Sequence, residues 1–224
     1  MTLRPLRIAI PAALLAAAVL PAGALAAPVL TRPLHPCYVS VDPAAREVVN
    51  IHASGFTPAQ AIDVRVDNGP ALTYEASRFG VVFAKIQAAV QAHGERPMTI
   101  TLVERGNPAN TLTLQTRVTA LAVTLKPKRA ATSDLIRFRG RGFTRQKPIW
   151  AHYVFDGRAR KTVRFATRPA TACGTFSVRR PQIPILRPRA GKWTLQVDQQ
   201  KRWSPSPNSV FVPIPITVRR IIGG

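Results

Sequence analysis

Two ten-residue segments share one pattern, and this pattern constrains the fold more than any other feature of the chain. They are Val48–Thr57, which reads VVNIHASGFT, and Leu135–Thr144, which reads LIRFRGRGFT. Apolar residues alternate with polar ones in both, and successive side chains of a β-strand point to opposite faces of the sheet. Each segment is therefore predicted to be a strand with one buried and one exposed face, followed by a Gly-Phe-Thr corner.

The repetition continues along the chain in the same order. Ile149–Tyr153 matches Ile62–Val66, and Trp193–Val197 matches Met98–Leu102, with Trp193 predicted to lie in a core. Repetition at this scale indicates two copies of one folding unit. The predicted boundaries are a Pro-rich lead at 27–37, a first domain at 38–120 and a second at 121–224. The second copy is longer, mostly within 158–172 and 201–208, where extended hairpins or loops are expected.

Short alternating runs separated by turn residues predict an all-β fold, namely two tandem β-sandwich domains. The strands predicted in the first copy are Tyr38–Val41, Glu47–Ser54, Ala61–Val66, Ala71–Glu75, Gly80–Ile86, Met98–Val103 and Thr111–Val118. Asp67-Asn68-Gly69 predicts a hairpin turn, because Asn-Gly tolerates the positive φ angles of a tight turn. A helical turn or two is predicted only at Ile86–His93.

Three phrases resemble landmarks of the immunoglobulin-like (Ig-like) domains found on bacterial secreted and surface proteins. They are Gly55-Phe56-Thr57-Pro58, Cys173-Gly174-Thr175-Phe176-Ser177-Val178 and Ala190-Gly191-Lys192-Trp193-Thr194-Leu195. The resemblance covers Tyr38 to about Arg220 in two copies. It implies an Ig-like sandwich that serves as a spacer, adhesion or binding module, usually without catalysis. Phe79–Phe83 departs from the pattern, which leaves the face taken by Phe83 open.

The first 26 residues predict a secretory signal peptide. A positively charged start precedes an apolar run from Ile8 to Val19 and the small residues Ala24-Leu25-Ala26, so cleavage is expected before Ala27. A membrane anchor is the alternative, but the run is interrupted by Pro11, and a spanning helix needs roughly 20 apolar residues. The mature chain is thus predicted to lack an integral membrane segment and to be secreted or associated with the cell envelope.

Cys37 and Cys173 are the two cysteines of the chain. In an oxidising compartment two cysteines most simply pair, which predicts a disulfide between the two copies. Two free thiols and a Cys37–Cys37 dimer are the alternatives.

Charge divides the two copies. Residues 28–122 include 8 basic residues (Lys or Arg) and 7 acidic ones (Asp or Glu). Residues 123–224 include 22 basic residues and 3 acidic ones. A GC-rich gene would scatter arginine over both copies, so this bias explains the difference poorly. Charge serving only solubility remains an alternative.

The basic copy predicts a polyanion-binding face. Arg137, Arg139 and Arg141 stand at the outward positions that Asn50, His52 and Ser54 occupy in the first copy. The other predicted contributors are Arg160 and Arg164, which continue this pattern only if their strand pairs regularly, and Trp150, unless its own domain's loops cover it. The expected partner is an anionic envelope polymer, a polysaccharide, a lipid surface or a nucleic acid.

The runner-up function is a structural or protein-adhesion spacer with no polyanion ligand. Catalytic and metal sites are not predicted. No histidine stands at a metal-ligand spacing from another histidine or from a carboxylate. The four histidines, read as neutral surface or loop residues, are His35, His52, His93 and His152. The sequence therefore predicts a non-enzymatic protein without cofactors.

Overall fold

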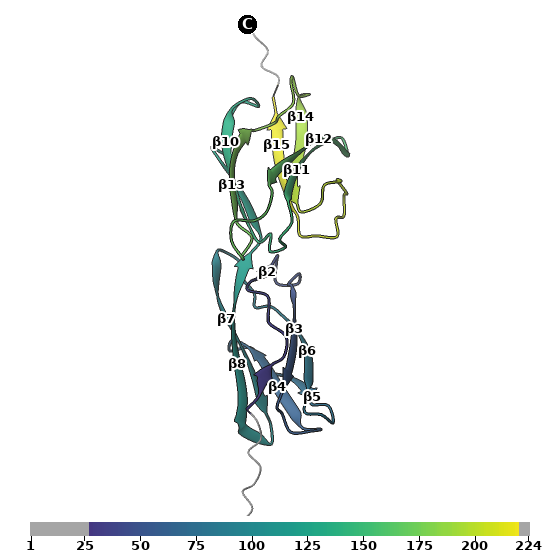
Figure 1. Ribbon diagram of the computed structural model, residues 1–224. Coiled ribbons are helices and arrows are strands. Elements are labelled where there is room, and N and C mark those ends of the chain that lie inside the picture. Colours follow the sequence, from purple (N-terminus) through teal and green to yellow (C-terminus); the bar gives the residue numbers. More distant parts are fainter. Residues whose placement is uncertain (1–26, 220–224) are drawn as a thin grey trace, which may run out of the picture.

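The computed structural model describes residues 27–219, and every regular element in this range is a β-strand (Figure 1). The predicted all-β sandwich is thus confirmed. The predicted signal peptide at 1–26 lies outside the described residues and stays a prediction. Among residues 27–219, none forms a helix long and apolar enough to cross a membrane.

The first eight strands form two sheets around one core and are called the N-terminal unit. The strands are β1 (Val29–Leu30), β2 (Tyr38–Ser40), β3 (Val48–Ser54), β4 (Ala61–Val66), β5 (Leu72–Glu75), β6 (Val82–Gln87), β7 (Glu95–Glu104) and β8 (Asn107–Ala120). One sheet has the order β1-β3-β6, and the other has the order β2-β8-β7-β4-β5. Their facing sides enclose a core that includes Ile51, Phe56 and Ile100.

The last seven strands form a second pair of sheets and are called the C-terminal unit. The strands are β9 (Ala122–Lys126), β10 (Leu135–Arg141), β11 (Ile149–Phe155), β12 (Arg158–Ala166), β13 (Phe176–Pro181), β14 (Gly191–Asp198) and β15 (Val212–Val218). The sheet orders are β13-β10-β9 and β12-β11-β14-β15. A separate core includes Phe138, Phe143 and the predicted core residue Trp193.

The two units share one topology. In the smaller sheets β3 lies between β1 and β6 as β10 lies between β9 and β13, and in the larger sheets β8-β7-β4-β5 corresponds to β15-β14-β11-β12. Strand β2 is extra and pairs in parallel with β8. Each unit is a β-sandwich of two facing sheets.

The Gly-Phe-Thr corners show why the sequence phrase repeats. Gly55 and Gly142 have φ angles of 94° and 88°, a region that favours glycine, and the phenylalanine that follows each is buried. The Phe56 N–H donates to the Gly80 carbonyl, at 3.2 Å between N and O, and the Phe143 N–H donates to the Gly174 carbonyl at 3.3 Å. Each corner is therefore locked by the same contact.

All seven strands predicted in the first copy are present, with ends displaced by a few residues. The hairpin at Asp67 also forms, between β4 and β5, with Asp67 itself at a φ of 49°. The helical turn predicted at Ile86–His93 is wrong. The alternation of β6 continues to Gln87, and Ala88 and Ala89 are then buried in the core without regular structure.

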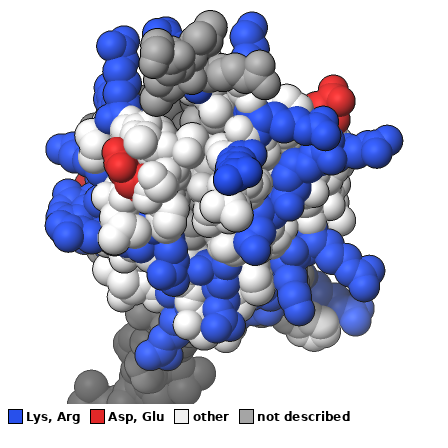
Figure 2. All heavy atoms as spheres, turned by 90° about the horizontal axis from the view of Figure 1, so that it is seen from above, with Lys and Arg blue, Asp and Glu red and all other residues white. Residues whose placement is uncertain are grey.

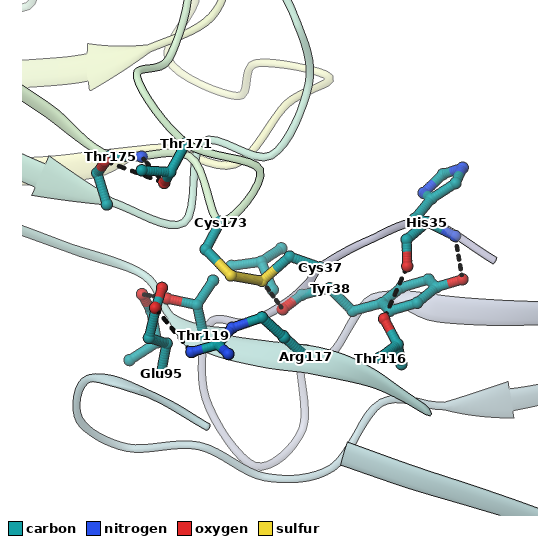
Figure 3. The surroundings of a disulfide bond; sticks show 12 residues. His35, Cys37, Tyr38, Glu95, Thr116, Arg117, Thr119, Thr171, Cys173 and Thr175 are labelled. Atoms are coloured by element: carbon teal, nitrogen blue, oxygen red, sulfur yellow. Dashed lines mark hydrogen bonds and ion pairs between the residues drawn. A yellow bond between two sulfur atoms is a disulfide. The ribbon is translucent and has the colours of Figure 1, made fainter. Parts of the chain in front are cut away.

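The two units meet end to end, with the disulfide at their junction (Figures 1 and 3). The predicted pairing of Cys37 with Cys173 is confirmed, and the two Cα atoms are 5.1 Å apart. Both cysteines are buried, and Cys37 immediately precedes β2 (Figure 3). A covalent bond therefore links the start of the N-terminal unit to the loop before β13.

Candidate polyanion-binding surface

The outer face of the β13-β10-β9 sheet is strongly basic. Along β10 the buried residues Ile136, Phe138 and Gly140 alternate with outward-facing arginines, which are Arg137, Arg139 and Arg141. Side chains on one face of a strand repeat every two residues, or about 6 to 7 Å. The strand thus presents a ladder of three guanidinium groups.

The ladder is widened by the strands on either side. Arg137 is directly opposite Lys126 of β9 and Arg179 of β13. Directly opposed residues of an antiparallel pair point to the same face, with Cβ atoms about 5 Å apart. We call the five residues Lys126, Arg137, Arg139, Arg141 and Arg179 the arginine face.

The other predicted binding residues lie on the opposite sheet. Trp150 of β11 is half-buried and lies opposite Arg164 of β12, on the outer side of the β12-β11-β14-β15 sheet. Arg160 occupies a β-bulge, where the register shifts between Tyr153 and Val154, and its Nε donates to the Phe155 carbonyl at 3.4 Å. The strand does not pair regularly. The six predicted residues do not share one sheet face, because the three arginines of β10 lie on one sheet and the residues of β11 and β12 lie on the other.

The two sheets are nevertheless linked by basic residues along one side of the unit. Strands β12 and β13 are edge strands of the two sheets, and they contact each other. Their exposed basic residues are Arg158, Arg160, Lys161, Arg164, Arg179 and Arg180. We call the arginine face together with these residues the basic belt. Figure 2, which looks along the molecule from above, shows Lys and Arg around its perimeter with few acidic groups between them.

The basic residues of the belt form no ion pairs, whereas three arginines of the N-terminal unit do. There Arg105 pairs with Asp63 at 2.7 Å, and Arg96 and Arg117 also form ion pairs. The hydrogen bond from Arg105, followed by one from Thr73, holds the pKa of Asp63 below its ordinary value. Between residues 122 and 219, by contrast, no Lys or Arg forms an ion pair with a carboxylate.

The interpretation of His152 as a surface or loop histidine is wrong. His152 and Asp198 are both 0% exposed, and the distance from His152 Nε2 to Asp198 Oδ1 is 3.3 Å. His152 Nε2 is also 3.0 Å from the Gln200 carbonyl oxygen, and Nδ1 is 3.0 Å from Thr162 Oγ1. Protein groups therefore occupy both ring nitrogens.

The cover over His152 is the loop 199–211, which joins β14 to β15. Trp203 Nε1 donates to Gln196 Oε1 at 3.2 Å, and Gln196 Nε2 donates to the Ser204 carbonyl at 3.0 Å. The corresponding connection in the N-terminal unit has only two residues, 105–106, and Arg65, which matches His152, is exposed there. His152 lies on the outer side of its sheet, because Ala151 and Tyr153 face the core, and strand alternation carries no signal for this cover.

Comparison with known proteins adds little to this description. No family profile and no curated protein sequence matches the chain. Among solved structures, the chain is similar to the chicken CNTN1 FN1-FN3 domains at 8% sequence identity and a TM-score of 0.27. That match covers 84% of this chain and 66% of the other. The fold assignment rests on the strands and sheets described above.

Proposed function

We propose that the protein is a secreted, non-enzymatic binding module whose C-terminal unit binds a polyanion through the basic belt. The observation that carries this proposal is the set of unpaired cations on the arginine face. Like charges held close together on a rigid sheet repel one another, and an anionic ligand would relieve that repulsion. Solubility alone would not require three arginines and two further cations on one sheet face.

The mechanism is multivalent electrostatic contact. Guanidinium groups bind phosphate or carboxylate oxygens through paired N–H donors, and each contact releases counterions from the polymer. The half-buried Trp150 beside Arg164 provides an apolar ring surface at the margin of the belt. The N-terminal unit acts as a near-neutral spacer, joined to the binding unit by the disulfide.

Protein adhesion is the second candidate function, because the N-terminal unit exposes two aromatic side chains. Phe79 is 74% exposed, with the Arg78 guanidinium 4.7 Å from its ring centroid. Phe83 is also exposed, on the outer side of β6, where its ring lies edge-on to His52 at 4.9 Å between centroids. Apolar groups of this kind suit a protein partner whose binding would be insensitive to salt.

The test compares two variants with equal loss of charge. The binding variant replaces Arg137, Arg139 and Arg141 by Ser in a chain that begins at Ala27. The control replaces Arg32, Arg65 and Lys85, three exposed cations of the N-terminal unit, by Ser. Binding of fluorescent single-stranded DNA, polyphosphate and polygalacturonate is measured by anisotropy between about 50 and 200 mM salt.

The unsubstituted chain is expected to lose affinity steeply with salt. The binding variant should bind DNA at least about tenfold more weakly at low salt, with a log–log salt slope reduced by about 2, whereas the control should change little. Equal weakening of binding in both variants would mean that affinity depends on the net charge of the chain and not on the arginine face. Salt-independent binding of a single protein partner would favour adhesion instead.

A further inference from the structure

The end of the C-terminal unit remote from the disulfide carries a protruding leucine. Leu186 is 92% exposed and lies in the loop 182–190, between β13 and β14. Leu135, which begins β10 opposite Pro181 at the end of β13, is 69% exposed at the same end of the sandwich. Leu135 lies beside Arg137 on the outer face of β10, at the margin of the basic belt, and Leu186 lies in the loop beyond it.

The loop that carries Leu186 is fixed in place. Ile183 is buried, and its N–H donates to the Thr132 carbonyl at 2.9 Å. Ile185 packs against the core, and the buried Trp193 donates from Nε1 to the Arg189 carbonyl at 2.9 Å. The loop thus uses its other large apolar side chains as anchors and leaves Leu186 in solvent.

The backbone beside Leu186 is strained. Arg187 has a φ of 51°, in the left-handed region, where glycine or asparagine would be less strained. Strain of this kind is often retained at functional sites. The arrangement sets two exposed arginines, Arg187 and Arg189, close to the protruding leucine in sequence.

The surroundings of Leu186 are cationic. Strand register places six exposed basic residues in the loops and strand ends at this end of the unit, namely Lys128, Arg129, Arg158, Arg187, Arg189 and Lys192. The acidic residues described there are Asp134 and Asp156. Figure 2 looks onto this end and shows the basic side chains spread around it.

We propose that this end of the molecule, which we call the distal tip, docks on an anionic lipid bilayer. Leu186 enters the interface between headgroups and acyl chains, while the basic residues around it contact anionic headgroups. Arginine and lysine suit this position because their apolar stems follow the leucine while their charged ends stay at the headgroup level. A soluble polyanion gives no reason to expose Leu186, whereas a bilayer combines dense negative charge with an apolar layer directly beneath it.

The test uses the chain that begins at Ala27, so that the apolar run of residues 8–19 does not itself bind lipid. Sedimentation is measured with vesicles of phosphatidylcholine alone and of phosphatidylcholine mixed with phosphatidylglycerol. The tip variants are Leu186→Ser and Arg187→Gly with Arg189→Ser, none of which removes a buried side chain. The controls are Phe79→Ser and the Ser variant of Arg137, Arg139 and Arg141.

The unsubstituted chain should bind the anionic vesicles and not the neutral ones. Each tip variant should reduce that binding at least about tenfold without changing affinity for soluble polyphosphate, and Phe79→Ser should have no effect. A fluorophore sensitive to polarity, attached at Leu186→Cys, should shift to the blue on anionic vesicles. The proposal is overturned if no vesicle binds, if Leu186→Ser binds normally, or if only the arginine-face variant loses binding. Loss of polyphosphate binding in that variant, with vesicle binding retained, supports both sites independently.

Discussion

The N-terminal and C-terminal units have the same strand order but differ in how their charges are paired. In the N-terminal unit, Arg96, Arg105 and Arg117 pair with carboxylates. In the described part of the C-terminal unit, no Lys or Arg pairs with a carboxylate. The outward-facing residues of β10 are arginines, unlike those of the matching strand β3. The buried pattern is common to both, so the fold and the surface chemistry are set by different residues of the same strands.

The two units share their corners but differ in the length of a loop. Both units keep the Gly-Phe-Thr corner and its hydrogen bond to a glycine carbonyl. They differ in the connection between the last two strands, which is 105–106 in one unit and 199–211 in the other. Only the longer connection covers the outer side of its sheet and encloses a polar cluster around His152.

The largest predicted effect tests whether the two corners are equivalent. Phe56→Ala and Phe143→Ala should each destabilise their own unit by about 3 to 5 kcal/mol, because each removes a buried aromatic ring from a closed core. All three tryptophans, Trp150, Trp193 and Trp203, belong to the C-terminal unit. Urea unfolding followed by tryptophan fluorescence therefore reports on that unit, whereas far-ultraviolet circular dichroism reports on both.

Phe143→Ala should lower the urea midpoint of the fluorescence transition, which reports the C-terminal unit. Phe56→Ala should instead produce a dichroism transition at lower urea than the fluorescence transition, because only the N-terminal unit is weakened. Coincident transitions in both variants would mean that the two units unfold together, with the disulfide and the junction coupling them. A small effect at one corner alone would show that the repeated phrase does not serve the same role in both units.

The strands were predictable because they depend on short-range patterns, and the disulfide was predictable because the chain has only two cysteines. The alternation of Ile136 and Phe138 with arginines determines which side chains of β10 face the core, and two cysteines allow only one intramolecular pairing. The bulge at Arg160 and the cover over His152 were not predictable. Both depend on how a longer second copy accommodates extra residues, and periodicity within a strand carries no information about insertions beside it.

The next prediction compares His152 with Arg65, the residue at its position in the N-terminal unit. His152→Ala should destabilise the C-terminal unit by about 3 kcal/mol, because it leaves the buried Asp198 carboxylate without one of its partners. Arg65→Ala should change stability by less than about 0.5 kcal/mol, because that side chain is exposed. Both are measured by urea unfolding, and protease cleavage within 199–211 should increase only in His152→Ala. A similar loss in both variants would contradict a special role for the covered sheet.

The smallest predicted effect concerns Glu104 and Gln199, which end β7 and follow β14 at matching buried positions. Glu104 fastens the last residue of the first Gly-Phe-Thr corner, and Gln199 fastens the residue that follows the second corner. Glu104 Oε2 accepts from the Thr57 N–H at 3.0 Å, whereas Gln199 Nε2 donates to the Arg145 carbonyl at 2.6 Å. Burial raises the pKa of Glu104, but hydrogen bonds from Thr57 and Asn110 outweigh it and leave the pKa below the ordinary value of 4.5.

Exchanging the two side chains should reverse the pH response of each corner. Since the folded-state pKa of Glu104 is lowered, its stabilisation is complete above the unfolded-state pKa and is lost as pH falls through the folded one. Glu104→Gln should therefore weaken the N-terminal unit by about 1 kcal/mol at neutral pH and reduce its loss of stability in acid.

Gln199→Glu would set a carboxylate against the carbonyls of Arg145 and Lys147, and this contact raises the pKa of the new carboxyl group. The C-terminal unit should therefore be weakened by about 1 to 3 kcal/mol at neutral pH and should recover stability in acid. Urea midpoints at pH values on both sides of 4.5, read by dichroism and by fluorescence, measure the two units. The same pH response in both exchanged variants would mean that the corners are fastened by packing and not by these polar contacts.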